Sequence, residues 1–162
     1  MITYSNIGYF GRLGNQMFQY ASLVGIATHR NFDYGIPYKN ADTEKTMNVR
    51  TGPEKLELTS VFKNLKAKDV TVEKPQTVYY DVACKHEPMY VELIKDGMDI
   101  LGYFQSEKYF SHCKQNIREQ FAFDTKEHMV SWHHVNKGTY DYPVCVHVRR
   151  GDYVQYEGIH DF

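Results

Sequence analysis

Two adjacent arginines follow a valine-rich run near the end of this 162-residue sequence, in the segment HVRRGDY (147–153). The alternation over 144–148 predicts a strand, and ligands of parallel sheets bind at the carboxyl ends of strands. Guanidinium groups hold phosphate oxygens in a bidentate way and stay charged at every working pH. We therefore predict an anion site in which Arg149 and Arg150 are the cations and Asp152 orients one of them. An ion pair on a solvated loop is the alternative.

A second candidate is the glycine-punctuated segment GRLGNQ (11–16), which separates a predicted strand from a predicted helix. Backbone N–H groups at a helix start hold anionic groups, and glycine lets a backbone come close to a ligand. The pattern is neither GxGxxG nor a P-loop, so a purely structural turn fits it as well as a ligand loop. The candidate binding residues are Gly11, Arg12, Gly14, Asn15 and Gln16.

Metal ligands and disulfides are not expected from this sequence. It contains no Asp-x-Asp pair, which is a common way to place a divalent cation on a diphosphate. The cysteines Cys84, Cys113 and Cys145 form no CxxC pair, and His133-His134 has no carboxylate or cysteine at ligand spacing. The sequence thus predicts reduced thiols, no metal site and no bound cofactor.

Predicted strands and helices alternate along the chain. We expect strands over 2–8, 31–38 and 77–80, helices over 17–27, 56–65, 107–121 and 126–135, a polar loop over 39–55 and a linker over 136–143. The helix over 17–27 is apolar on most sides, which is typical of a buried helix. Ser106 is the predicted N-cap of the helix at 107. The segments 89–94 and 98–104 predict a hairpin, with two strands of one parallel sheet as the alternative. This alternation predicts an α/β fold with a mostly parallel sheet.

Composition and charge narrow the function classes. The formal net charge is −1, with 19 basic and 20 acidic residues, and no basic stripe suggests nucleic acid. No run of about 18 apolar residues predicts a membrane span, and no signal peptide is visible after Met1. The 14 tyrosines and 9 phenylalanines are suggestive of sugar stacking as well as of core packing. We expect a cytoplasmic protein and leave peripheral contact with the inner membrane face open.

Three segments together resemble one family. GRLGNQMFQYA (11–21), LGYFQSEKYF (101–110) and HVRRGDY (147–153) are similar to the signature blocks of the α-1,2-fucosyltransferases, family 11 of the glycosyltransferases. The order of the three segments along the chain also agrees with that of the family. One departure is Arg12, where many members have glycine, although a related protein O-fucosyltransferase family carries a similar GRxGNQ loop.

The resemblance implies a metal-independent, inverting enzyme of the GT-B type that moves L-fucose from GDP-fucose to the 2-hydroxyl of a galactoside. It implies that the arginine motif, with His147 and Tyr153 at its ends, contacts the diphosphate of the donor. Without a metal, fixed cations must take up the charge of the departing diphosphate. Asn15 is a reasonable partner of the donor, and Asp152 is a candidate base as well as an orienting group.

The larger departure from the family is the short length of the sequence, because GT-B enzymes have two Rossmann-like domains. We expect residues 1–140 to be the first Rossmann-like domain and 141–162 the first strand and arginine loop of a truncated nucleotide-binding domain. The expected partners are GDP-fucose and a galactose-containing glycan acceptor, and the fragment alone is expected to be inactive. A non-catalytic sugar- or nucleotide-binding remnant of the fold is the alternative.

Overall fold

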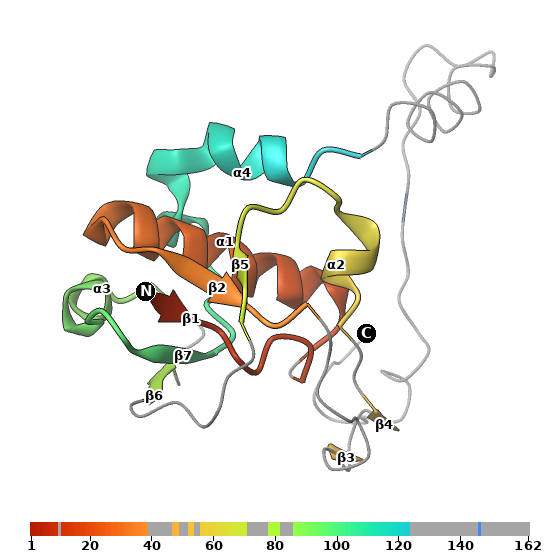
Figure 1. Cartoon of the computed structure of the whole chain (residues 1–162), viewed down its shortest axis with the longest axis horizontal. Helices are drawn as coiled ribbons and strands as arrows, with labels where there is room; N and C mark the ends of the chain where they lie inside the picture. The colour runs from red at the N-terminus through yellow and green to blue at the C-terminus, as the bar shows by residue number, and fades with distance from the viewer. Residues whose placement is uncertain are drawn as a thin grey trace. The chain divides into compact units, whose positions relative to one another are not determined.

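The computed structural model describes residues 1–9, 11–38, 47–48, 52–53, 56–70, 78–81, 86–123 and 146. The chain divides into two units, Met1–Phe123 and Asp124–Phe162, and every described helix and strand lies in the first (Figure 1). The helix predicted over 126–135, the linker and the final strand lie outside the described residues. The predicted domain boundary after residue 140 stays a prediction.

A five-stranded sheet forms the centre of the first unit. Its strands are β1 (Ile2–Thr3), β2 (Tyr34–Ile36), β5 (Lys68–Asp69), β6 (Val78–Asp81) and β7 (Asp99–Gly102). The order across the sheet is β5-β2-β1-β7-β6, and every neighbouring pair is parallel. Thr3 pairs with Gly35 on one side and with Asp99 on the other, so β1 is the central strand. The predicted α/β class and parallel, Rossmann-like sheet are confirmed.

The strand order reverses between β1 and β7. From β1 the chain adds β2 and β5 on one side, forms β6 at the opposite edge, and then returns to place β7 beside β1. In open parallel sheets, ligands bind outside the carboxyl ends of the strands at such a reversal. A ligand site is therefore expected at the carboxyl ends of β1 and β7.

Helix α1 (Leu13–Arg30) packs on the sheet, and α4 (Lys114–Gln120) lies over α1 on the side away from the strands (Figure 1). The predicted buried helix is confirmed, because every residue of 19–27 is buried. The helix begins earlier than predicted, so the second half of the glycine loop forms its first turn. Gly25 allows close packing, since a Cβ there would lie 2.2 Å from the carbonyl oxygen of Tyr109.

Shorter elements complete the unit. They are the antiparallel pair β3 (Met47–Asn48) and β4 (Gly52–Pro53), the helices α2 (Leu58–Val61) and α3 (Pro88–Leu93), and the 3-10 helices η2 (Glu107–Tyr109) and η3 (Ser111–Cys113). The predicted elements at 31–38, 56–65 and 77–80 are confirmed as β2, α2 and β6. The first strand is shorter than predicted, because turns begin at Ser5.

The helix predicted over 107–121 is divided into η2, η3 and α4. Ser106 is the N-cap of η2, as predicted, and its hydroxyl accepts from the Lys108 N–H at 3.4 Å. Phe110 has a φ of −135°, which interrupts the helical backbone where the chain presses against Gly25. The apolar stripe is nevertheless confirmed, since Tyr109 and Ile117 are buried and Phe110, Cys113 and Phe121 pack against the core.

The predicted hairpin of 89–94 with 98–104 is wrong. Residues Pro88–Leu93 form helix α3, and β7 pairs in parallel with β6 instead. Proline is favoured in the first turn of a helix, and parallel strands need a crossover connection, which α3 supplies here. A short apolar run does not distinguish the two structures. Ile94 is buried, whereas Met89 and Leu93 face solvent.

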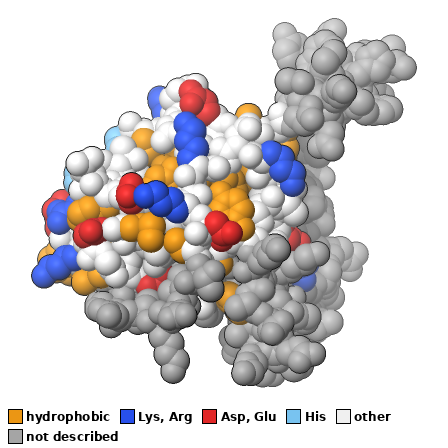
Figure 2. Space-filling view, in the orientation of Figure 1, with side chains coloured by type: hydrophobic (Ala, Val, Ile, Leu, Met, Phe, Trp, Pro, Cys, Tyr) orange, Lys and Arg blue, Asp and Glu red, His pale blue; other side chains and the backbone are white. Residues whose placement is uncertain are grey.

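The core is formed by buried side chains from the sheet, α1, α2 and the segment after β7. Its large, fully buried members are Tyr4, Tyr20, Phe62, Phe104, Ile2, Ile7, Leu23, Ile26, Ile36, Leu58, Ile94 and Ile100. On the face drawn in Figure 2, the described Lys and Arg side chains are interspersed with Asp and Glu. Among the described helices, none combines the length and apolar character needed to cross a membrane.

Candidate functional site

The glycine loop is shaped around the side chain of Asn15. Gly11 has a φ of +82°, a left-handed conformation that favours glycine. A Cβ at Gly11 would lie 2.0 Å from Nδ2 of Asn15, so glycine also leaves the room that the amide occupies. Gly14 is exposed, and a Cβ there would have no neighbour within 4 Å. The two glycines therefore have different roles, and only Gly11 is required by the loop itself.

Gln16 connects the glycine loop to α2 from inside the protein. Its side chain is 0% exposed. Nε2 donates to the carbonyl oxygen of Gly11 at 3.2 Å, and Oε1 accepts from the N–H groups of Glu57 and Leu58 at 2.9 and 3.1 Å. Buried polar groups need such partners, so Gln16 fixes the loop. The substrate contact predicted for Gln16 stays a prediction.

A carboxylate lies at the start of α1. Oε2 of Glu57 accepts from the N–H of Leu13 at 3.1 Å, and a negative group is favourable at a helix N-terminus. Arg12 is the exposed N-cap residue of α1, and its carbonyl accepts from the Gln16 N–H at 3.1 Å. The helix start that was predicted to hold an anion thus already has one carboxylate on its first N–H.

The segment after β7 meets the glycine loop directly. Nε2 of Gln105 donates to Oδ1 of Asn15 at 2.7 Å, across 90 residues of sequence. Asn15 lies in the first turn of α1, which follows β1, and Gln105 follows β7, so the bond spans the reversal of strand order. Two of the three signature segments therefore come together at the carboxyl edge of the sheet.

A buried carboxylate holds the beginning of the loop after β1. Asp99 is 0% exposed. It accepts from the Thr3 hydroxyl at 2.6 Å, and from the N–H and hydroxyl of Ser5 at 2.8 and 2.6 Å. Charged hydrogen bonds of this kind are the stronger ones in proteins. Asp99 thus orients the chain as it leaves β1 toward the glycine loop.

The predicted arginine motif consists of Arg149, Arg150 and Asp152, with His147 and Tyr153 at its ends. All five residues lie outside the described residues. Their predicted roles, and the shared site of Asn15 and Arg149, stay predictions. Among the residues that the structure does describe, no group of three or more His, Cys, Asp or Glu is arranged to hold a metal ion.

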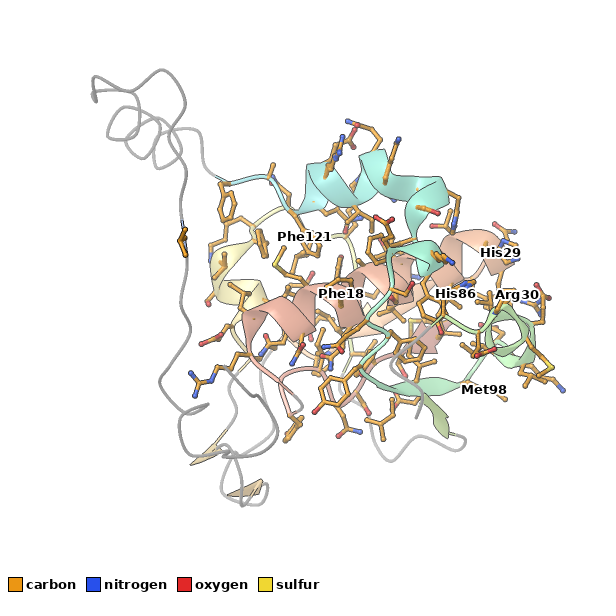
Figure 3. The ribbon with its side chains drawn as sticks, turned by 180° about the vertical axis from the view of Figure 1, so that it is seen from behind. Phe18, His29, Arg30, His86, Met98 and Phe121 are labelled. Carbon is orange, nitrogen blue, oxygen red and sulfur yellow. The ribbon has the colours of Figure 1, made fainter. Side chains whose placement is uncertain are left out.

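A shallow cavity of about 210 Å³ lies at the opposite end of α1, where Figure 3 shows His29, Arg30 and His86 together. Its lining residues are His29, His86, Pro88, Val91, Glu92, Lys108, Tyr109 and His112. His29 lies in the last turn of α1, whereas the glycine loop precedes its first turn. This cavity is therefore separate from the site at the ends of β1 and β7.

Comparison with known proteins agrees with the resemblance of the signature segments. The family description "Glycosyl transferase family 11" matches residues 2–160, so the chain belongs to that family. It is 34% identical over 157 residues to a galactoside 2-alpha-L-fucosyltransferase of Caenorhabditis elegans, with 93% of this chain covered. It is 28% identical over 171 residues to an alpha-1,2-colitosyltransferase of Escherichia coli, with 89% covered. No solved structure gives a significant match.

The chain spans only part of these relatives. It covers 38% of the C. elegans protein and 53% of the E. coli protein. The family is therefore established, whereas the activity of the whole protein is a matter for proposal.

Two residues of the site were not predicted from the sequence. Gln105 stands inside the segment LGYFQSEKYF that carried the family resemblance, so a signal was present although no role was assigned to it. Glu57 had no local signal, because it reaches Leu13 across 44 residues. Both act through contacts between distant segments, which the spacing of residue types does not encode.

Proposed function

We propose that the protein containing this chain is a galactoside 2-α-L-fucosyltransferase, which transfers L-fucose from GDP-fucose to the 2-hydroxyl of a galactose-containing glycan. The observation that carries the proposal is the family match over residues 2–160, which includes both the glycine loop and the arginine motif. The name of the C. elegans relative supplies the transferred sugar, L-fucose, and the galactoside class of the acceptor. The bond between Asn15 and Gln105 supports a site at the sheet edge where the first two signature segments meet.

The proposed reaction is a single displacement. The acceptor hydroxyl oxygen forms a bond to the anomeric carbon of fucose while the bond from that carbon to the diphosphate oxygen breaks. GDP leaves with the electron pair, and the hydroxyl proton passes to a base. Attack from the face opposite the diphosphate inverts the anomeric carbon. Negative charge grows on the departing diphosphate, and groups that stabilise this charge contribute most to the rate.

We assign the stabilisation of that negative charge to Arg149 and Arg150, without a metal ion. Asp152 is assigned to orienting one of the two guanidinium groups. Two guanidinium forks match the geometry of phosphate oxygens, which a lysine ammonium does not. His147 and Tyr153 are also assigned to the donor in this proposal, as is the glycine loop with Asn15. In this proposal residues 1–140 are the first half of a GT-B enzyme, and most of the guanosine pocket belongs to the second half.

The test is a transfer assay on the full-length protein with GDP-fucose and a panel of β-galactosides, with the product linkage determined by NMR. We expect an α-1,2-linked fucose in the presence of EDTA as well as without it. The E. coli relative is named for colitosyl transfer, so the donor panel includes the colitosyl nucleotide. Donor binding without transfer to any acceptor would favour the non-catalytic binding module instead.

Arg149→Lys tests the mechanism in the same assay. Removing a bidentate interaction with the transition state in this way costs about 2–4 kcal/mol, or about 30- to 1,000-fold in kcat. We expect a smaller change in the donor KM and an unchanged melting temperature. Normal kinetics in the folded variant would make Arg149 a surface charge, and transfer that requires added manganese would rule out the metal-free mechanism.

A further inference from the structure

The contact between Asn15 and Gln105 is a direct side-chain bond between the glycine loop and the segment after β7. Gln105 is exposed and Asn15 is half-buried, so the pair lies at the protein surface at the carboxyl edge of the sheet. An exposed hydrogen bond between two neutral amides adds little to stability, because water is an equivalent partner for both groups. Its place between two signature segments therefore suggests a role in the site rather than in the fold.

The backbone that carries Gln105 is held in an uncommon conformation. Gly102 has a φ of +140°, and Phe104, a bulky residue, has a φ of +49°. The carbonyl oxygen of Phe104 accepts from the Ser106 N–H at 2.7 Å and from the Ser22 hydroxyl of α1 at 3.2 Å. Positive φ at a non-glycine residue is strained, and such strain is common in functional segments. Because Phe104 is also 0% exposed, the position of Gln105 relative to α1 is fixed.

The bond determines which atoms Asn15 offers to a ligand. An asparagine amide has one acceptor oxygen and an NH₂ group that donates two hydrogen bonds. Gln105 donates to the oxygen, so the NH₂ group of Asn15 lies along the glycine loop beside Gly11. In this orientation Asn15 presents donors, which suit an oxygen-rich ligand. The opposite orientation would present an oxygen and repel the same ligand.

We propose that Gln105 is a positioning residue that fixes the Asn15 side-chain amide with its NH₂ group toward an oxygen atom of the nucleotide-sugar donor. The inference rests on the proposed function and adds a residue to it. The ligand oxygen belongs either to the diphosphate or to a hydroxyl group of the sugar. Gln105 itself is not required to touch the donor.

The test compares Gln105→Glu and Gln105→Ala in the full-length protein, with Gln115→Glu and Gln115→Ala as matched controls. Gln115 is also exposed and also bonds a single side chain, Glu119, but it lies on α4. An ionised carboxylate at position 105 accepts hydrogen bonds only, so it turns the Asn15 amide and points the oxygen at the donor. We expect Gln105→Glu to lower kcat/KM for the donor by about 10- to 100-fold at pH 7.5, and Gln105→Ala by about 3- to 10-fold. The acceptor KM and the melting temperature stay unchanged, and both control variants stay within about twofold of the unsubstituted protein.

The pH profile separates positioning from a merely structural effect. The introduced carboxyl group titrates near its ordinary pKa of about 4.3 and donates a hydrogen bond when protonated. The activity of Gln105→Glu relative to the unsubstituted protein should therefore rise as the pH falls from 8 toward 5, whereas the ratio for Gln105→Ala stays flat. Calorimetry with GDP and with GDP-fucose identifies the ligand oxygen. Weaker binding of both ligands indicates the diphosphate, and weaker binding of GDP-fucose alone indicates the sugar.

Each outcome decides between the two proposals. If the unsubstituted protein transfers fucose and Gln105→Glu has unchanged kinetics, the positioning role is wrong. A pH-independent loss with a lowered melting temperature also overturns it, because that result marks a structural contact. If the unsubstituted protein binds GDP-fucose without transferring it, the proposed function fails. Weaker GDP-fucose binding by Gln105→Glu would then still support the positioning of Asn15 by Gln105. Absence of any GDP or GDP-fucose binding overturns both.

Discussion

The two ends of helix α1 are held by different kinds of interaction. At the Leu13 end, the buried amide of Gln16 bonds three backbone groups of the glycine loop and of α2. At the Arg30 end, Asn31 adopts a left-handed φ of 56°, and its N–H reaches the carbonyl oxygens of the last turn. There the Arg30 guanidinium forms an ion pair with the exposed Glu92 carboxylate, and Nε2 of His29 lies 3.3 Å from the same carboxylate.

The two kinds of interaction differ in how strongly they hold the backbone at each end of α1. The ion pair of Arg30 with Glu92 lies at the surface, where such pairs contribute little. The buried amide holds a specific backbone geometry, because each of its hydrogen bonds would break if the loop moved. Helix α1 thus begins at a loop that a buried side chain holds, and it ends in a common helix terminus. The candidate site lies at the end that the buried Gln16 amide holds.

The largest expected effect on the free energy of unfolding is that of Gln16→Leu. Leucine leaves the N–H groups of Glu57 and Leu58 without this acceptor inside the protein, and an unsatisfied buried group costs about 1–3 kcal/mol. We expect the free energy of unfolding to fall by about 3 kcal/mol, measured by urea denaturation. Gln115→Leu on the surface of α4 is the matched control and should change stability by less than about 0.5 kcal/mol. A loss below about 1 kcal/mol for Gln16→Leu would mean that the two ends of α1 are held equally well.

Gly11→Ala should have the next largest effect. The alanine Cβ would meet the Asn15 amide and would force an unfavourable positive φ, so we expect a loss of about 1–3 kcal/mol. Gly14→Ala is the control in the same loop, where the Cβ meets no neighbour and the position is helical. That change should raise stability by up to about 1 kcal/mol. Equal effects of the two variants would show that the loop has no special geometry at Gly11.

Tyr20, near the middle of α1, should make stability depend on pH at the alkaline end. Its hydroxyl donates to Gln120 and accepts from the N–H groups of Lys66 and Ala67. Burial, followed by the neighbouring Tyr34, raises the pKa of Tyr20 well above its ordinary value. The unfolded chain therefore loses this proton first, at about pH 10, and the free energy of unfolding falls as the pH rises above about 10.

The measurement is urea denaturation between pH 8 and 11. We expect Tyr20→Phe to cost about 1–2 kcal/mol at pH 8 and to show a shallower alkaline decline than the unsubstituted protein. Tyr34→Phe is a comparison of intermediate size, because Tyr34 is only half-buried and contributes to the raised pKa of Tyr20; its alkaline slope should lie between those of Tyr20→Phe and the unsubstituted protein. The same alkaline slope in Tyr20→Phe and the unsubstituted protein would contradict the prediction.

Glu92→Ala should have the smallest effect. The carboxylate is 60% exposed, pairs with Arg30 and lies 3.3 Å from Nε2 of His29, in contacts that water and salt screen. We expect a loss below about 1 kcal/mol at low salt, which falls further in 0.5 M NaCl. Thermal unfolding at the two salt concentrations is sufficient to measure it. A loss as large as that of Gln16→Leu would reverse the ranking of the two ends.

Local patterns predicted the parts of the fold that depend on local sequence. The apolar periodicity of α1 was predicted because the helix buries a continuous stretch of chain, and the strand β2 was predicted from its place directly after that helix. The segment 89–94 was mispredicted because its apolar residues fit a strand as well as a helix, and the choice was made by the pairing of β6 with β7.

The candidate site was predicted less completely than the fold. A glycine-punctuated turn over 11–16 was predicted, but the requirement for glycine at position 11 comes from the space taken by the Asn15 amide, which depends on how the helix begins. The roles of Gln16, Glu57 and Gln105 depend on bonds across 41, 44 and 90 residues, and no local pattern carries that information. The arginine motif remains a sequence prediction.

The position of β7 beside β1 also affects the synthesis of the protein. Thr3 and Asp99 are bonded neighbours that lie 96 residues apart in the sequence. Ribosomes add about 5–20 residues per second, so β1 waits roughly 5–20 seconds for the strand that covers its second edge. During that interval β2 is the only one of the two neighbours of β1 that has been synthesised, so the central strand of the finished sheet has an unpaired edge. Unpaired edges of this kind associate with other chains, so the nascent protein is most prone to aggregate before the segment at β7 leaves the ribosome.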